Sequence, residues 1–283
     1  MRLLMPIAAA LLLQAAPAFA DKQAQMAASP PTRETMQAMS AALADPRRAA
    51  DRPRDVWRHP AQTLKFFKVD PGMTVVDYMP SGGWYTRVLV PFLGPSGRYI
   101  GLNPDVSAAP AQMKQYLGNL AGTLPAKTAE WTGVPAERVA AFNTDGLPAE
   151  LGGKVDRVLI FREMHNLWRM NILHRELLAV RRLLKDDGLL GIEQHRAKPT
   201  APAAYTDGSK GYLREKDVIA LIEAHGFALV GKSEVNANPN DPANHPDGVW
   251  TLPPNYRLGD KDRARYTAIG ESDRMTLLFR KRP

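Results

Sequence analysis

The sequence predicts an α/β domain in which a parallel sheet carries helices on both faces. Short apolar segments rich in β-branched residues alternate with helical segments of roughly 10 to 15 residues, which is typical of parallel strands joined by crossover helices. The chain has 283 residues, of which 45% are hydrophobic, enough for one large core. It contains no Cys, so disulfides, thiolate metal sites and cysteine nucleophiles are excluded and packing must stabilise the fold.

The elements follow one another in a regular order. The charged segment 51–60 opens a short helix that ends before the turn Asp70-Pro71-Gly72. The first strand, 73–79, is a continuous apolar run of the kind that is buried on both faces. Further strands are expected at 98–102, 138–142, 155–161, 189–194, 227–232 and 274–280, and helices at 84–93, 111–120, 172–184 and 215–224.

One segment breaks this alternation. Residues 235–272 are rich in Asn, Pro and Asp and show neither a helical nor a strand period. A connection of that length inside a compact domain usually marks a lid or a binding loop. We therefore expect a single domain over 51–283 with a lid or insertion at 235–272.

The N-terminus has the three parts of a secretory signal peptide, expected over 1–20. Arg2 supplies the basic start, Leu3 to Leu13 form a short apolar run, and Ala18-Phe19-Ala20 ends in small residues. The apolar run is too short for an anchor, since crossing a bilayer takes about 20 residues. We expect cleavage near Ala20, a loose leader over 21–50, and export to the periplasm of a mature chain without a membrane span.

The charge composition narrows the class of partner. The chain has 37 Lys and Arg against 29 Asp and Glu, a net charge of +8 spread along its length. This mild excess only weakly favours anionic partners, and the basic-aromatic motifs of nucleic-acid modules do not occur in the sequence. We expect a small-molecule ligand and no nucleic acid. The sequence does not indicate an oligomeric state.

A candidate binding loop follows the first strand. Ligands of an open parallel sheet bind at the carboxyl ends of the strands, where the strand order reverses. This rule selects Asp77 and the loop 79–83, because the paired Gly82 and Gly83 would let a ligand approach the backbone closely. A plain tight turn also explains the two glycines, but their place directly after a buried strand that ends near Asp77 favours a binding loop.

Three segments together resemble a class I S-adenosylmethionine-dependent methyltransferase: VVDYMPSGGWYT at 75–86, KDDGLLGI at 185–192 and IEAHGF at 222–227. The resemblance runs from about Arg52 to Arg280. It implies a doubly wound, Rossmann-like sheet of seven mostly parallel strands with an antiparallel last strand, helices on both faces, and S-adenosylmethionine as cofactor.

A narrower resemblance is to the exported predicted methyltransferases that carry a signal peptide. Their entry segment is similar to Arg-x-x-Asp-x-x-Arg-x-Pro at 52–60, and a second element to Phe-Arg-x-x-His-Asn at 161–166. This resemblance implies methyl transfer to a small-molecule acceptor that the sequence does not name.

The resemblance assigns cofactor roles to residues at the ends of the first three strands. Met79 and Ser81 stand where the family usually has glycines, and Asn103 stands where it usually has an acidic residue. A turn residue is an equally good interpretation of Asp145. The residues implied are Asp77, Ser81, Gly82 and Gly83 for the methionine end, Asn103 for the ribose, and Asp145 with Gly146 for the adenine.

Residues after the fourth strand are the candidates for chemistry. Methyl transfer from a sulfonium is an in-line displacement, so the protein mainly aligns the acceptor and excludes water, with a base where the acceptor must lose a proton. We predict His165 and Asn166 as catalytic residues, with His165 as the base, although a lone His is more often structural. The predicted substrate-pocket residues are Tyr85, Arg162, Glu163 and His195.

Two other functions compete with this prediction. The departures at the glycine loop and at Asn103, together with export from the compartment that makes the cofactor, favour an exported binding protein that keeps the fold without catalysis. A metal site would need His165, His195, His245 and Glu193 to converge under the lid. No tight ligand spacing supports such a site, and we expect no metal.

Overall fold

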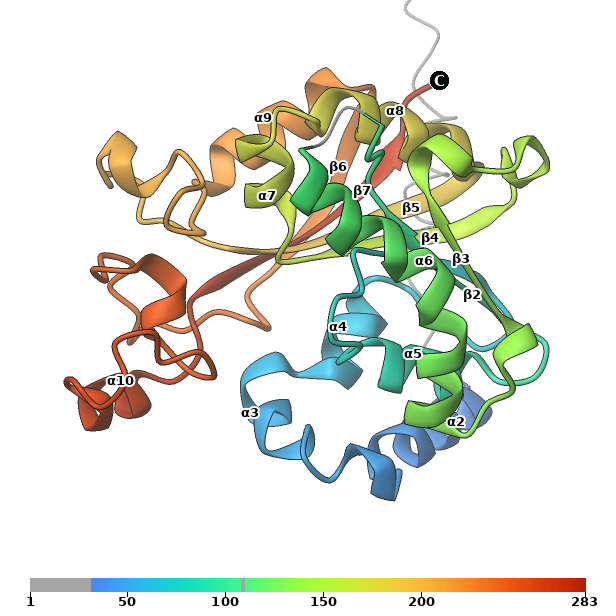
Figure 1. Cartoon of the computed structure of the whole chain (residues 1–283), viewed down its shortest axis with the longest axis horizontal. Helices are drawn as coiled ribbons and strands as arrows, with labels where there is room; N and C mark the ends of the chain where they lie inside the picture. The colour runs from blue at the N-terminus through green and yellow to red at the C-terminus, as the bar shows by residue number, and fades with distance from the viewer. Residues whose placement is uncertain (1–31, 108–109) are drawn as a thin grey trace, which may run out of the picture. The chain divides into compact units, whose positions relative to one another are not determined.

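The structure, a computed structural model, describes residues 32–107 and 110–283 (Figure 1). The predicted signal peptide, 1–20, and the first part of the predicted leader, up to residue 31, lie outside the described residues. Within the described part of the chain, no helix is long and apolar enough to cross a membrane.

The sheet has seven strands in the order β3-β2-β1-β4-β5-β7-β6. β7 runs antiparallel to both β5 and β6, and the other pairings are parallel. This arrangement confirms the predicted doubly wound, Rossmann-like sheet of seven mostly parallel strands with an antiparallel last strand. The strands are β1 (Thr74–Tyr78), β2 (Arg98–Asn103), β3 (Val139–Asn143), β4 (Val155–Phe161), β5 (Leu184–His195), β6 (Phe227–Ser233) and β7 (Arg274–Lys281).

The strand order reverses beside β1. This strand pairs with β2 on one side and with β4 on the other, so Asp77 lies next to Gly101 and to Leu159. The chain therefore leaves β1 and β4 at adjacent points on the same edge of the sheet. A crevice at such a reversal is where open α/β sheets bind their ligands.

Helices cover both faces of the sheet and enclose a separate apolar core on each (Figure 1). One core packs α8 and α9 against the strands, and the other packs α2, α4, α5 and α6 against them. Helix α6 is longer than the predicted 111–120. The helices are α2 (Arg33–Ala44), α3 (Asp55–Arg58), α4 (Pro60–Phe66), α5 (Thr86–Leu93), α6 (Ala111–Thr132), α7 (Met164–Arg169), α8 (Leu173–Leu183), α9 (Glu215–Ala224) and α10 (Arg263–Ile269).

The described part of the predicted loose leader is ordered structure. Helix α2 packs against α5, and Ala42 is buried between them. Arg48 is 1% exposed and forms an ion pair with Asp55 at 2.7 Å. The apolar face of α2 is short, so the stability of this helix comes from its packing on α5.

The segment 235–272, predicted as a lid or insertion, contains the short 3₁₀ helix η7 (Gly248–Thr251) and α10. Buried polar contacts attach it to the sheet edge. The Asn236 side chain donates a hydrogen bond to Thr276 Oγ1 of β7 at 3.0 Å, and Asp241 accepts one from the Tyr212 hydroxyl at 2.9 Å. The absence of a period in the sequence reflects a segment that is held by polar side chains instead of an apolar stripe.

Candidate active site

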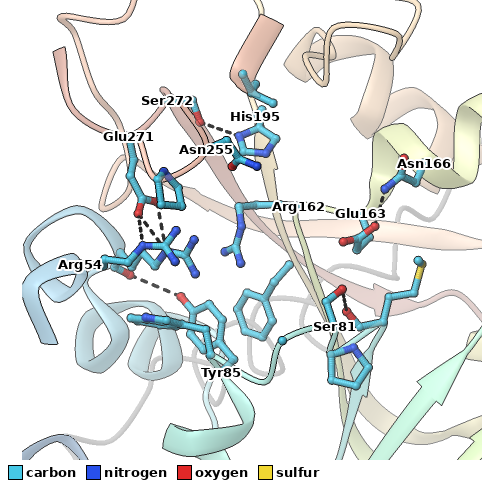
Figure 2. A pocket seen from close by; sticks show the side chains of 18 of the residues that line it. Arg54, Ser81, Tyr85, Arg162, Glu163, Asn166, His195, Asn255, Glu271 and Ser272 are labelled. Atoms are coloured by element: carbon cyan, nitrogen blue, oxygen red, sulfur yellow. Dashed lines mark hydrogen bonds and ion pairs between the residues drawn. The ribbon is translucent and has the colours of Figure 1, made fainter. Parts of the chain in front are cut away.

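A cavity of about 600 Å³ lies at the carboxyl ends of β1, β4 and β5. Most of its lining comes from the entry segment 51–58, the loop after β1 with the start of α5, the β4–α7 connection and the segment 249–272, and Tyr116 of α6 and His195 of β5 complete it. Figure 2 shows Arg162 between Glu271 and Arg54 on one side and Glu163 and Asn166 on the other. The cavity thus lies at the sheet edge that the strand-end rule selected, and residues of the segment 235–272 form one of its walls.

The loop after β1 exposes backbone to the cavity at Gly82. Met79 and Ser81 adopt positive φ angles of 54° and 50°, a conformation that costs non-glycine residues free energy. The Ser81 hydroxyl donates a hydrogen bond to the Met79 carbonyl at 3.2 Å. A Cβ added to Gly82 would meet nothing within 4 Å, so this residue faces open space.

Gly83, the second glycine of this loop, packs against helix α6. Its φ is +72°, and a Cβ there would overlap the indole ring of Trp131 on α6. Gly83 is not among the residues that line the cavity. Its lack of a side chain is therefore required by helix packing, whereas the open backbone at Gly82 is available to a ligand.

Asp77 lies at the floor of the cavity and is 2% exposed. The Tyr99 hydroxyl donates a hydrogen bond to its Oδ2 at 2.9 Å, and Thr86 Oγ1 lies 2.8 Å from that hydroxyl. Burial raises the pKa of Asp77 to about 7, even though Tyr99 and Arg162 favour the charged form. A nearby cation would ionise this carboxyl fully.

Glu163 is a second carboxyl group on the same side of the cavity. Burial raises its pKa to about 7, against the hydrogen bond that Asn166 Nδ2 donates to its Oε2 at 2.6 Å. A carboxyl with that pKa can accept or release a proton near neutral pH. Sequence reasoning placed Glu163 in the substrate pocket but could not predict its pKa, because the pKa depends on burial.

His165 and His195 lie together at the cavity wall, with ring centroids 5.8 Å apart. Burial lowers the pKa of His165 to about 4 and that of His195 well below its ordinary value. His195 Nδ1 lies 2.6 Å from the Ser272 hydroxyl, whereas His165 Nδ1 is buried without a hydrogen-bond partner among the described residues. Both rings are therefore neutral at pH 7.

Tyr85 forms the aromatic side of the site. Its ring stacks on Phe161 with centroids 3.5 Å apart and planes at 10°. Its hydroxyl donates a hydrogen bond to Glu193 Oε2 at 3.1 Å. The sequence correctly placed Tyr85 and Phe161 near the strand ends, and the structure shows that they pack on each other.

Arginines form the remaining wall. Arg162 has a φ of 63° and donates to Glu193 Oε1 at 3.2 Å, and Arg274 donates to the same oxygen at 2.8 Å.

Glu271 accepts hydrogen bonds from Arg54 at 2.7 Å and from Arg58 at 3.0 Å. Burial opposes ionisation of Glu271, but Arg274, Arg58 and Arg54 outweigh it and lower its pKa to about 2. We call Arg54, Arg58, Arg162, Arg274, Glu193 and Glu271 the arginine cluster.

The predicted ribose and adenine residues lie outside the cavity lining. Asn103 is 0% exposed, and neither its Oδ1 nor its Nδ2 has a hydrogen-bond partner within the described ranges. Asp145 and Gly146 are exposed after β3. The structure thus brings the methionine-end and substrate-pocket residues together, apart from Gly83, and leaves these three at the neighbouring strand ends.

The four residues considered for a metal site do not converge. His245 Nε2 lies 2.8 Å from Asp241 Oδ1, in the network that holds the segment 235–272. Glu193 is engaged by two arginines. Among the described residues there is no group of three or more His, Asp or Glu side chains placed to hold a metal ion.

Comparison with known proteins gives structural likeness only. No family model matches the chain, and a search of the curated proteins found no match. A SAM dependent methyltransferase from Aquifex aeolicus is 19% identical, with 71% of this chain and 93% of that chain covered and a TM-score of 0.47.

Two further solved structures are similar in fold. The 1,6-didemethyltoxoflavin-N1-methyltransferase of Burkholderia thailandensis, with bound 1,6-didemethyltoxoflavin and S-adenosylhomocysteine, is 16% identical, covers 90% of this chain and 94% of its own, and has a TM-score of 0.44. The [4+2]-cyclase SpnF is 15% identical, covers 80% of each chain and has a TM-score of 0.49. Likeness at this level concerns the fold, which the sheet already defines.

Proposed function

We propose that this protein is an S-adenosylmethionine-dependent methyltransferase that acts on a small molecule. The observation that carries the proposal is the position of the cavity, which opens on the Met79–Gly82 loop and on Asp77 where the strand order reverses. In a doubly wound sheet this is the point at which a nucleotide-like ligand binds.

Three features of the chain fit the cofactor. Gly82 leaves backbone open to the cavity, and Asp77 is a carboxyl group that a neighbouring cation would ionise. Asn103 lies outside the cavity lining, but its buried amide oxygen and nitrogen both lack protein partners among the described residues, which leaves them free to bond a ribose hydroxyl that reaches the end of β2. When bound, the cofactor supplies an electrophilic methyl group.

The chain's own residues position the acceptor and handle its proton. Glu163 has a pKa of about 7 and lines the cavity, so it is the better base for an acceptor that must lose a proton near neutral pH. Asn166 orients the Glu163 carboxylate through its 2.6 Å hydrogen bond. His165, with a pKa of about 4, is a weak base and more suitable as a neutral hydrogen-bonding wall.

Export is part of this proposal. The basic start, apolar run and Ala18-Phe19-Ala20 support removal of residues 1–20 and a periplasmic location. N-terminal sequencing of the protein from a fractionated cell tests it. Protein that retains Met1 and stays with the cytoplasmic fraction would contradict export without affecting the proposed chemistry.

A second candidate is an exported binding protein that has kept the fold without catalysis. Trp131 occupies the space at Gly83, and Met79 and Ser81 place side chains in a loop where the family usually has glycines. The cavity lining also omits Asn103, Asp145 and Gly146. These features favour a ligand smaller than the whole cofactor.

Calorimetry with S-adenosylhomocysteine separates the two candidates. The methyltransferase proposal requires saturable heat at one site per chain, weakened at least about tenfold by Asp77→Asn, which is about 1.4 kcal/mol of binding free energy. Asp156→Asn is the matched control, because Asp156 lies at the opposite end of β4, where it pairs with Lys185 at 2.6 Å. Absence of heat at millimolar ligand would rule out the cofactor and leave the binding-protein candidate.

A further inference from the structure

The arginine cluster carries more positive than negative charge. It contains four guanidinium groups and two carboxylates, an excess of two positive charges. Four of its six members are deeply buried: Arg58 is 5% exposed, Arg274 1%, Glu193 0% and Glu271 4%. Burial, followed by repulsion from Arg162, lowers the pKa of Arg58 to about 9, so Arg58 remains charged at neutral pH. Charge of this density below a cavity requires a counterion or a ligand.

Several donors of the cluster are unused. Arg58 donates to Glu271 through Nε alone, and Arg162 donates to Glu193 through Nη1 alone, as far as the described residues extend. Both side chains line the cavity. Aromatic rings hold them in place, since the Arg58 guanidinium lies 4.7 Å from the Trp84 ring centroid and that of Arg162 lies 5.9 Å from the Tyr85 centroid. The free nitrogens are thus oriented without being neutralised.

The opposite wall does not cancel this charge. Asp77 and Glu163 hydrogen-bond to Tyr99 and Asn166, and neither forms an ion pair with an arginine of the cluster. Both have pKa values near 7, so they are partly protonated at neutral pH. The cavity is therefore polarised, with cations on one wall and two weakly ionised carboxyl groups on the other.

We propose that the arginine cluster binds an oxyanion, a carboxylate or a phosphate, carried by the methyl acceptor. This inference rests on the proposed function and names the substrate class of the same site. Guanidinium groups bind planar or tetrahedral oxyanions through paired N–H donors, and the unused nitrogens of Arg58 and Arg162 supply such donors at one wall. The carboxyl groups at the other wall are left for the cationic end of the cofactor.

The first test uses small anions that need no knowledge of the acceptor. Thermal unfolding of the full protein is followed with benzoate, with inorganic phosphate, and with benzamide as the neutral isostere of benzoate, at matched ionic strength. We expect benzoate or phosphate to raise the midpoint in a saturable way and benzamide to leave it unchanged. Equal shifts for benzoate and benzamide, or none for either anion, would overturn the proposal.

Substitutions in the arginine cluster test whether the anion binds there. Arg162→Met and Arg54→Met should each weaken anion binding at least tenfold; Arg54 is 26% exposed, so its variant has little reason to unfold. Arg214→Met is the matched control, because Arg214 pairs with Asp217 at 3.2 Å outside the cavity lining. Anion binding that survives both cluster variants would place the anion elsewhere and refute the assignment.

The cofactor has a carboxylate of its own, and a second arm distinguishes that source. S-adenosylhomocysteine and methylthioadenosine, which lacks the amino-acid end, are titrated into wild type and Arg54→Met, because Arg162 also affects the ionisation of Asp77. The proposal requires both to bind the variant as they bind wild type. Selective loss of S-adenosylhomocysteine would show that the cluster holds the cofactor's carboxylate. If neither S-adenosylhomocysteine nor methylthioadenosine binds to the wild-type protein while benzoate still binds, the proposed methyltransferase function would be refuted. The proposal of an anion-binding site would stand.

Discussion

The indole ring of Trp131 occupies the space that a side chain on Gly83 would need. The adjacent Gly82 faces open space. Two consecutive glycines in one loop therefore have different causes, helix packing for the second and an open cavity wall for the first.

Substitution of Gly83 should mainly lower the stability of the protein, whereas substitution of Gly82 should mainly weaken ligand binding. Gly83→Ala forces an overlap with Trp131 at a φ of +72°, and we expect a loss of about 2–4 kcal/mol in the free energy of unfolding. Gly82→Ala should change stability by less than about 1 kcal/mol and weaken S-adenosylhomocysteine binding. Urea unfolding and calorimetry measure the two effects. Equal destabilisation by both variants would contradict the assignment.

Asp77 should lower the stability of the protein at high pH. Its pKa is raised from 3.8 to about 7, so between those values the folded state binds a proton more readily than the unfolded chain, and stability falls as the pH rises through that window. Asp77→Asn should be the more stable protein at pH 8, by at most about 4 kcal/mol, and the difference should vanish below about pH 4. Urea unfolding across that pH range measures it, and wild type equal to the variant at pH 8 would show that Asp77 ionises at no cost.

Glu271 should lower the stability of the protein at low pH, the opposite of the effect expected for Asp77. Its pKa is lowered to about 2, so its contribution to stability is present above pH 4.5 and is lost as the pH falls toward 2. Glu271→Gln leaves three arginines short of a partner and should cost about 3–5 kcal/mol at pH 7. Asp186→Asn is the control, because the Asp186 carboxylate is fully exposed where it pairs with Lys281, and its substitution should leave the free energy of unfolding nearly unchanged. A cost that stays constant from pH 7 to pH 2.5 would disprove this linkage.

Neither His165 nor His195 should take up a proton between pH 5 and 8, because burial lowers both pKa values. Glu163 should titrate near pH 7. Nuclear magnetic resonance of labelled imidazoles and carboxyl carbons follows both, with Glu163→Gln to assign the carboxyl signal. A His165 that titrates near 6.5 would restore it as the favoured base.

The elements that the sequence predicted well are those whose signal is local. The strand 155–161 and the helix 215–224 have the predicted bounds, because a β-branched apolar run and an apolar stripe that ends in His225-Gly226 are readable within one segment. Helices α7 and α10 were missed, since each is short and held by tertiary contacts.

The candidate site divides in the same way. The strand-end rule placed Asp77, the loop after it, and the residues after β4 around one cavity from their order in the chain. It could not place Glu271 against Arg58, because those residues are 213 positions apart. It also could not show that Trp131 fills the space at Gly83.

The sequence by itself determined the sheet of alternating strands and helices and the sheet edge at which the cavity lies, because hydrophobic periodicity and connection order are properties of the chain. Only the tertiary structure decided the charge of that edge. The pKa values of Asp77, Glu163 and Glu271 depend on burial and on arginines brought from distant segments, and no pattern of neighbouring residues encodes either.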